Sequence, residues 1–313
     1  MKTAPVVSII IPTFNRRRLL AETIDSVRDQ SLENWELFVI DDCSTDDTYE
    51  YTSSIKDDRI TPIRLTENSE RSRARNLGLS RAKGKYVLFL DDDDLLYPNS
   101  LKDQVEALES SPGSIASIGS YIMFDENGEV RDFPIVKKAH VANIYNDLLF
   151  GWMATAGHTL FVTQAVRDIG GWNEDISFAE DHELWLRIAR DSTVVLIPNM
   201  ILKYRVHGGQ WRPDNQKQIM TDLRNEAIQR LGSGAQKNAR GIMRARELLP
   251  EAEELYENAK AFSALKKYIQ IAWNAPVLLF SPLSNPVTFK PMLKCFLGNT
   301  GIRLGRYLTS RIR

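Results

Sequence analysis

Short apolar runs rich in β-branched residues alternate with longer, periodically apolar segments along the first 125 residues. In the first long segment, Leu20, Ile24 and Val27 have the i, i+4 and i+7 spacing that places three side chains on one helix face. Strands that alternate with such helices predict a parallel sheet covered on both faces. The predicted strands are 6–11, 35–40, 60–65, 86–90 and 114–124, and helices are expected at 17–30, after Ser44, at 73–82 and from Pro98.

The pattern changes after the turn-like segment 125–128. Residues 130–215 mix aromatic segments with a Gly170-Gly171 turn, which predicts a second half that packs on the same sheet. Helices are expected at 216–270, and apolar patches then alternate with proline and basic residues. The predicted organisation is an α/β domain at 1–215, with a Rossmann-like half at about 1–125 and a second half at about 126–215, followed by a helical extension at 216–313.

With 313 residues, of which 43% are hydrophobic, the chain can bury a large core. The formal net charge of −1 hides an uneven distribution, because residues 258–313, the basic tail, contain no Asp or Glu. No nucleic-acid partner is expected. The charged residues of the basic tail are Lys260, Lys266, Lys267, Lys290, Lys294, Arg303, Arg306, Arg311 and Arg313.

The chain has only two cysteines, Cys43 and Cys295, which argues against a disulfide framework and a cysteine zinc site. A reducing, cytoplasmic location is therefore expected. The apolar run near the N-terminus contains two prolines and leads directly into a strand-like pattern, so it is interpreted as structure and not as a signal peptide. No apolar stretch reaches the roughly 18 residues that a membrane-spanning helix needs, so any membrane contact would be peripheral.

Polar residues follow three of the predicted strands, at 12–16, 41–44 and 91–94. In open α/β sheets, ligands bind outside the carboxyl ends of the strands, so these segments are the candidate site. The last of them is four adjacent aspartates, whose mutual repulsion raises their pKa values unless a cation neutralises them. Oxygen ligands of this kind suit Mg²⁺ or Mn²⁺. A solvated acidic turn is the alternative interpretation.

Six segments, in this order between residues 6 and 210, resemble the family-2 glycosyltransferases, which are inverting, nucleotide-sugar-dependent enzymes. The resemblance implies the GT-A fold, in which a Rossmann-like nucleotide-binding half and an acceptor-side half share one mixed sheet. Here a helical extension would follow it. The segments are SIIIPTFNR, LFVIDDCSTDDT, ARNLGLSRAKGKYVLFLDDDDLLYP, GGWNE, AEDHELWLR and YRVHGG.

The resemblance implies a nucleotide site after the first two strands. Phe14 would lie beside the base and Asp42 would accept a base N–H, although a core aromatic and a turn or cap residue are the alternatives. Arg75 would pair with phosphate. The implied nucleotide-binding residues are Pro12, Thr13, Phe14, Asn15, Asp42, Arg75, Asn76, Asp91 and Asp92.

The resemblance also ranks the four aspartates, with Pro98 fixing the register of the motif. Asp93 would bind Mn²⁺ or Mg²⁺, Asp91 would contact ribose or metal, Asp94 would give support, and Asp92 would fill the variable middle position. His207 would reach the metal or the diphosphate, with a structural histidine as the alternative. The family has a glycine where this chain has Glu70, which leaves the loop on the diphosphate side less defined.

A second candidate centre is the pair Glu180-Asp181, ahead of a helix with a buried stripe of Leu184, Trp185 and Ile188. The resemblance makes Asp181 the base that takes a proton from the acceptor hydroxyl, with Glu180 supporting acceptor binding. An N-capping pair is the alternative. The implied acceptor contacts are Trp172, Asn173, Glu174 and Trp185.

The function implied is transfer of a single sugar from a nucleotide-sugar donor to a hydroxyl of a glycan, glycolipid or polysaccharide precursor. A UDP-sugar is the commonest donor of this kind. The Q-x-x-R-W motif of processive synthases is absent. The alternative is a non-catalytic nucleotide-sugar- or carbohydrate-binding protein on the same fold. A nucleotidyltransferase would need a glycine-rich phosphate loop, which the Thr13-Phe14-Asn15 segment is not.

The basic tail interleaves its charges with apolar residues, which suggests peripheral contact with an anionic membrane. The alternative is a helical appendage that covers the domain or makes an oligomer contact. The apolar residues in question are Trp273, Leu278, Leu279, Phe280, Phe296 and Tyr307.

Overall fold

The computed structural model describes residues 4–208, 213–258 and 261–279 of the chain. It divides into two compact units. The first, the sheet unit, comprises the chain up to Asn143 together with Ala154–Met220, and the second, the helical unit, comprises Ile144–Met153 and the chain from Thr221. The predicted division differs, because it assigned 144–153 to the second half of the sheet domain. Residues 280–313, with the calls on Phe280, Phe296, Tyr307 and most basic-tail charges, lie outside the described residues, as does Lys260.

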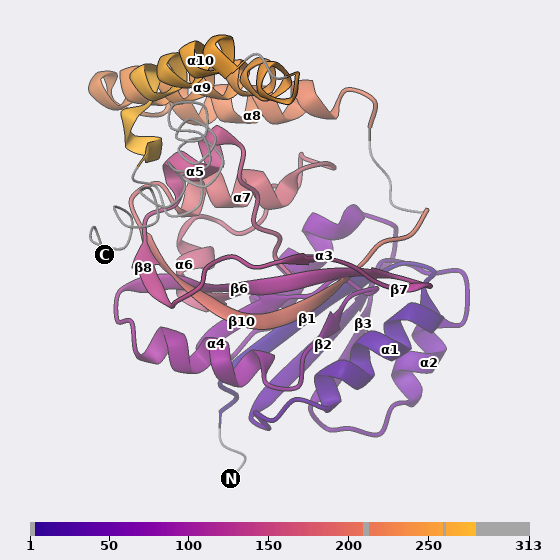
Figure 1. Ribbon diagram of the computed structural model, residues 1–313. Coiled ribbons are helices and arrows are strands. Elements are labelled where there is room, and N and C mark those ends of the chain that lie inside the picture. Colours follow the sequence, from indigo (N-terminus) through magenta and orange to yellow (C-terminus); the bar gives the residue numbers. More distant parts are fainter. Residues whose placement is uncertain (1–3, 209–212, 259–260, 280–313) are drawn as a thin grey trace. The chain divides into compact units, whose positions relative to one another are not determined.

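The sheet unit is built on one mixed sheet with the strand order β3-β2-β1-β4-β9-β6-β10-β5, as predicted for the GT-A fold (Figure 1). Strands β3, β2, β1 and β4 pair in parallel, whereas β9 is antiparallel to both β4 and β6. The strand order reverses around β1, which brings the ends of β1 and β4 together. The strands are β1 (Val7–Thr13), β2 (Trp35–Asp41), β3 (Ile60–Arg64), β4 (Tyr86–Phe89), β5 (Leu95–Leu96), β6 (Ser114–Asp125), β7 (Gly128–Phe133), β8 (His140–Ala142), β9 (Thr159–Val162) and β10 (Thr193–Arg205).

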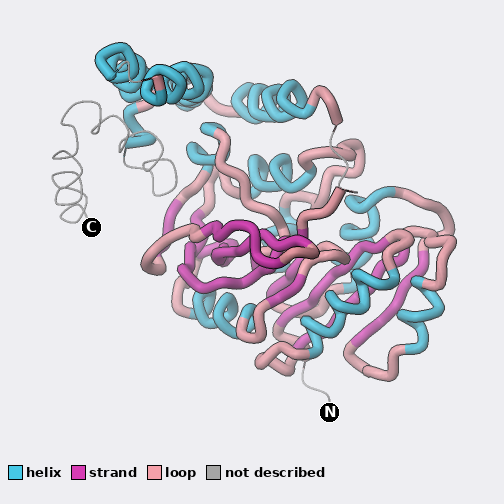
Figure 2. Tube along the Cα trace, turned by 45° about the vertical axis from the view of Figure 1, so that its right-hand side comes forward, coloured by secondary structure: helices cyan, strands magenta, loops and turns pink. Residues whose placement is uncertain are grey.

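Helices cover both faces of this sheet (Figure 2). Most predicted helices are present with boundaries shifted by a few residues. The helix after the second strand begins at Thr48, later than the cap expected at Ser44, and the next begins at Glu70, one turn earlier than predicted. The helices of the sheet unit are α1 (Arg17–Arg28), α2 (Thr48–Ser54), α3 (Glu70–Arg81), α4 (Ser100–Glu109), α6 (Thr163–Asp168) and α7 (Glu180–Ile188).

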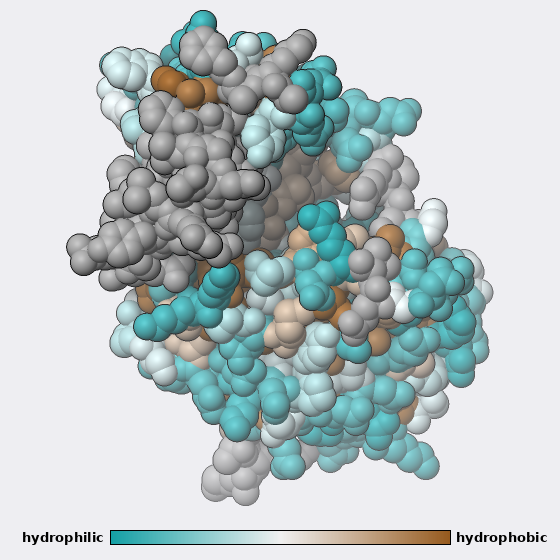
Figure 3. All heavy atoms as spheres, viewed as in Figure 1, coloured by the Kyte–Doolittle hydropathy of each residue, from teal (hydrophilic) through white to brown (hydrophobic). Residues whose placement is uncertain are grey.

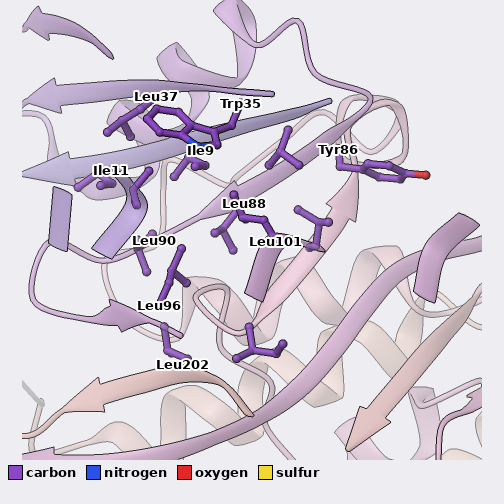
Figure 4. Close-up of a cluster of buried hydrophobic side chains, with 14 of the residues drawn as sticks. Ile9, Ile11, Trp35, Leu37, Tyr86, Leu88, Leu90, Leu96, Leu101 and Leu202 are labelled. Carbon is purple, nitrogen blue, oxygen red and sulfur yellow. The ribbon is translucent and has the colours of Figure 1, made fainter. Parts of the chain in front are cut away.

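Alternation along β1 explains why its run Ile9–Ile11 is apolar at every position. Ile9 and Ile11 point into the cluster formed with α1 and α4, which includes the predicted Leu20, Ile24 and Val27 (Figure 4). Ile10 points to the opposite face, where α3 packs so closely that a Cβ on Gly78 would lie 2.5 Å from Ile10 Cγ2. A strand buried on both faces cannot alternate polar and apolar side chains.

The helical unit contains α5 (Tyr145–Phe150), α9 (Ser233–Glu257) and α10 (Ala261–Asn274), with the short 3₁₀ helix η1 (Pro276–Leu279); α8 (Gln216–Gln229) begins in the sheet unit and continues into this one. Its core includes Ile242, Ala245, Tyr268 and Ile271, all buried. None of the described helices is long and apolar enough to cross a membrane. The face of the molecule in Figure 3 is mostly hydrophilic over the sheet unit, with small apolar patches.

Candidate active site

The site is built where β1 and β4 end side by side. The hydroxyl of Thr13, the last residue of β1, donates to Asp92 Oδ2 at 2.7 Å, which ties the first strand end to the aspartate turn. Asn15 has a positive φ of 53° and accepts hydrogen bonds from the backbone N–H groups of Thr45 (2.7 Å) and Asp46 (3.3 Å). Its side chain therefore joins the β1 and β2 loops, and its nucleotide contact stays a prediction.

The four aspartates have four different environments. Asp94 is buried and accepts the Arg205 backbone N–H at 2.8 Å, and burial raises its pKa well above the ordinary value. Burial also raises the pKa of Asp92, to about 6. Burial acts in the same direction on Asp91, but Arg75, Arg71 and Arg16 outweigh it and hold its pKa below the ordinary value. The predicted variable position, Asp92, is thus a fixed part of the turn.

One carboxylate oxygen of Asp93, Oδ2, is contacted both by an arginine and by a histidine. Arg16 Nη1 donates to Asp93 Oδ2 at 2.7 Å and to Asp92 Oδ1 at 3.0 Å. His207 Nε2 lies 3.0 Å from the same Asp93 Oδ2. The structure therefore brings His207 to Asp93 across more than a hundred residues of sequence, and its contact with a metal or a diphosphate stays a prediction.

Arg205, near the end of β10, holds the aspartate turn from behind. Its Nε donates to the Asp93 carbonyl oxygen at 2.7 Å, and Nη2 donates to Glu22 of α1 at 2.6 Å. The guanidinium also lies 4.6 Å from the ring centroid of Phe124. Because β10, α1 and the turn converge on this one side chain, Arg205 fixes the direction in which Asp93 and Asp94 point.

Arg75 of α3 is the buried cation between the two candidate centres. Its side chain is 1% exposed, and it donates to Asp91 at 2.7 Å and to Glu180 at 3.1 Å. Its Nη1 is also 3.8 Å from Asp181 Oδ1, and the guanidinium lies over the Trp172 ring at 4.3 Å. Arg75 thus joins a carboxylate after β4 to carboxylates at the start of α7, and its contact with phosphate stays a prediction.

Asp181 has the surroundings of a general base. It lies in the first turn of α7, and its Oδ2 accepts the Ala156 backbone N–H at 3.2 Å. Burial raises its pKa to about 7, opposed by Arg75 and reinforced by Glu180. Such a carboxylate is basic enough to accept a proton and still ionised in part at neutral pH. No described residue donates a hydrogen bond to its Oδ1.

Phe14 and Asp42 both lie in the candidate nucleotide region, but Phe14 is exposed and Asp42 is buried. The Phe14 side chain is 42% exposed, so the core alternative is wrong and the ring is available to a ligand. Asp42 is buried, and its Oδ1 accepts from Ser69 N at 2.8 Å at the start of α3. This bond occupies one carboxylate oxygen with the residue before α3, and the contact of Asp42 with a base stays a prediction. Pro12 is buried within β1, paired with Ile40 of β2.

The predicted acceptor loop is fastened to α3 by one amide. Asn76 accepts from Trp172 N at 2.8 Å and donates to Trp172 O at 2.9 Å and to Glu174 at 2.7 Å. Asn76 thus anchors this loop, and its contact with the nucleotide stays a prediction. Asn173 is half-buried and accepts from the Asp175 N–H, and Glu174 is exposed.

The two tryptophans expected to contact an acceptor are buried. Trp185 is fully buried with its ring 5.1 Å from that of Phe161, so it belongs to the core, as the stripe of α7 requires. Trp172 is 3% exposed and packs edge-on against Phe89 while its face receives Arg75. Direct acceptor contact is therefore corrected to a supporting position for both residues.

Within the described part of the chain, no three His, Cys, Asp or Glu side chains converge tightly enough to enclose a metal ion. Asp93 and His207 nevertheless meet at Asp93 Oδ2, with an oxygen and a nitrogen donor at the same point. Mg²⁺ and Mn²⁺ are commonly held by one or two carboxylates and completed by substrate phosphate oxygens. The residues fit a cation that arrives with a diphosphate better than a closed, resident metal centre.

Sequence reasoning gave no role to Arg16 and Arg205. Arg16 follows β1 within one of the quoted segments, and its position at a strand end beside the aspartates was a signal that could have singled it out. Arg205 had no comparable signal, because its partners Glu22 and Asp93 are distant in sequence.

The comparisons with known proteins agree with this geometry. The family described as Glycosyl transferase family 2 matches residues 8–167. An uncharacterized glycosyltransferase of Rickettsia felis is 34% identical over 203 residues, which cover 65% of this chain and 33% of that protein. A putative teichuronic acid biosynthesis glycosyltransferase, TuaG of Bacillus subtilis, is 37% identical over 131 residues, 41% of this chain and 52% of that one. The matches thus span about a third to a half of these curated relatives.

Solved structures show the same fold at low sequence identity. S. aureus TarS 1-349 in complex with UDP-GlcNAc has a TM-score of 0.65 and 18% identity, covering 96% of this chain and 91% of that one. The same protein in complex with UDP has a TM-score of 0.64. The family match over residues 8–167 includes the ends of β1, β2 and β4 and the aspartate turn. This chain belongs to glycosyl transferase family 2.

Proposed function

We propose that the protein is an inverting glycosyltransferase that moves one sugar from a UDP-sugar to a hydroxyl of a glycan, glycolipid or polysaccharide precursor. The observation that carries the proposal is Arg75, whose guanidinium contacts Asp91 on the donor side and lies 3.8 Å from Asp181 on the base side. Two carboxylates with separate roles are thus within reach of one sugar. TarS, a structural neighbour, was solved with UDP-GlcNAc, which supports UDP as the donor nucleotide.

In the proposed reaction, Asp181 takes the proton of the acceptor hydroxyl as that oxygen attacks the anomeric carbon. The bond between this carbon and the donor phosphate oxygen breaks, and UDP leaves with the electron pair from the opposite side. Asp93 and His207 would hold Mn²⁺ or Mg²⁺, which supplies Lewis-acid stabilisation of the diphosphate. Phe14 offers its exposed ring to the base, and Arg75 keeps Asp91 and Glu180 in place.

The donor half of the proposal is tested by thermal-shift measurement with a panel of nucleotide-sugars, with and without Mn²⁺. A bound donor raises the melting temperature by mass action. Asp93→Ala should remove the metal-dependent part of the shift, whereas Asp181→Asn should keep it. Asp168→Asn, an exposed carboxylate on α6, is the matched control and should behave as wild type.

The catalytic half is tested by assaying transfer with the donor that the panel identifies. Asp181→Asn should lower transfer by at least about a hundredfold while it binds donor normally, since general base catalysis contributes that much. Transfer by Asp181→Asn at the wild-type rate would refute the base assignment. A wild-type protein that no nucleotide-sugar stabilises would refute the donor assignment.

A further inference from the structure

Arg16 occupies an unusual position among the cations of the site. It immediately precedes α1, after the β1 loop, and one nitrogen, Nη1, donates to carboxylates of both Asp92 and Asp93. Those two carboxylate side chains are 7% and 10% exposed, whereas the Arg16 side chain is 35% exposed. The acids are therefore held inside the protein, and the cation that neutralises them comes from the solvent side.

A second arginine of the site, Arg75, is buried and held in one place. Arg75 is 1% exposed and is held by Asp91, Glu180 and the Trp172 ring, which come from separate elements. Among the described residues, Arg16 forms ion pairs with Asp92 and Asp93, both in the aspartate turn. A side chain that is 35% exposed can swing into the solvent, and a metal ion that arrives at Asp93 neutralises the buried carboxylates that it leaves. Arg75 thus has a structural role, whereas Arg16 is able to exchange its carboxylate partners for another anion.

The atom that Arg16 occupies is the one that the proposed metal needs. Asp93 Oδ2 receives Arg16 Nη1 at 2.7 Å and lies 3.0 Å from His207 Nε2. A guanidinium and a divalent cation repel each other and cannot share one carboxylate oxygen at these distances. Entry of a metal at Asp93 therefore requires that Arg16 moves away.

We propose that Arg16 is an exchangeable counter-cation, which neutralises Asp92 and Asp93 in the donor-free protein and moves to the donor diphosphate when a divalent metal takes its place. The inference rests on the proposed function, because it concerns the same site. A diphosphate is the natural next partner, since arginine binds phosphate oxygens through paired N–H groups. Metal alone gives the displaced guanidinium no new anion, so metal without donor should bind weakly. Metal and donor then bind cooperatively.

The test compares Arg16→Gln with Arg18→Gln, which removes the same charge from an exposed position two residues along α1. Mn²⁺ affinity without nucleotide is measured by electron paramagnetic resonance. UDP affinity is measured by calorimetry in EDTA and in Mn²⁺. Arg16→Gln should bind Mn²⁺ alone at least about fivefold more tightly and UDP in EDTA at least about fivefold more weakly, the usual size of coupling between sites. Arg18→Gln should stay within about twofold of wild type on both measures.

Arg16→Lys provides a second variant, which keeps the charge and should retain weak Mn²⁺ binding in the absence of UDP. Urea unfolding of each variant establishes that the site is intact. If Arg16→Gln binds Mn²⁺ no more tightly than Arg18→Gln does, the exchange is refuted while the donor assignment stands. If wild type binds neither Mn²⁺ nor UDP, both the exchange and the proposed function are wrong.

Discussion

At the scale of single residues, the site is surrounded by strained backbone. Asn15, Cys43, Glu70 and Ala179 have φ values of 53°, 65°, 67° and 63°, in the left-handed region that residues other than glycine rarely adopt. Asn15 and Cys43 follow β1 and β2, respectively. Glu70 is the first residue of α3, and Ala179 precedes α7, so all four lie where a strand or helix meets the site. The resemblance implies a glycine at position 70, and the unfavourable φ of Glu70 gives a physical reason for such a preference.

Glu70→Gly should relieve this strain. The left-handed conformation costs a non-glycine residue about 1–2 kcal/mol, which exceeds or matches the entropy cost of glycine. Glu106→Gly, at an exposed position inside α4, should instead lose about 1 kcal/mol of helix propensity. Urea unfolding should therefore find Glu70→Gly at least about 1 kcal/mol more stable than Glu106→Gly. Equal stability of the two variants would show that Glu70 carries no strain.

At the scale of elements, α3 connects the parts of the site. It contacts β1 through Gly78, it reaches Asp91 and α7 through Arg75, and it fastens the loop at Trp172 through Asn76. One short helix thereby sets the spacing between the donor-side aspartates and the candidate base. The hydrogen bonds of Arg75 and Asn76 offset the cost of burying polar side chains on this helix face.

Arg75→Met should destabilise the protein by about 3–5 kcal/mol, because it leaves the buried Glu180 and the partly exposed Asp91 without their shared cation. The double variant Arg75→Met/Glu180→Gln should regain part of this loss, since one uncompensated charge is removed. Arg73→Met, on the same helix but 52% exposed, is the control and should stay within about 0.5 kcal/mol of wild type. A loss below 1 kcal/mol for Arg75→Met in urea unfolding would contradict the bridging role.

At the scale of the whole molecule, the helical unit presents an apolar surface of its own. Trp273 is 86% exposed and Ile269 is 50% exposed, and their i, i+4 spacing places them on one face of α10. Lys266 is exposed one turn earlier. The basic tail to which these residues belong has no acidic residue. These observations favour the hypothesis of peripheral contact with an anionic membrane, where lipid-linked acceptors reside.

Full-length protein should sediment with vesicles that contain anionic phospholipid at low salt and much less with neutral vesicles or at high salt. Ile269→Ser/Trp273→Ser should sediment several-fold less, because it loses apolar area without a change of charge. Met153→Ser/Tyr256→Ser removes exposed apolar side chains elsewhere in the helical unit and serves as the control. Equal sedimentation of both double variants would eliminate α10 as a membrane-contacting helix.

Local patterns were sufficient for β1–β4 and β6, for most helices and for the two acidic motifs, whereas β5 and β7–β10 were not predicted. The apolar runs predicted β1, β2 and β4 because strands covered on both faces are mostly apolar. Asp91–Asp94 and Glu180-Asp181 were found because each motif is contiguous and adjoins a readable strand or helix. The exposure of Phe14 was not readable, since an aromatic residue after a strand has the same sequence pattern in a core and in a ligand site.

What the sequence determined by itself was the order of the elements and the chemistry available at their ends. The tertiary structure decided which cation meets which acid: Arg75 with Asp91 and Glu180, and Arg16 with Asp93. It also decided that Trp185 belongs to the core and that Asn76 anchors a loop. These outcomes depend on contacts between residues far apart in the chain, and periodicity and motif spacing report only on neighbours in sequence.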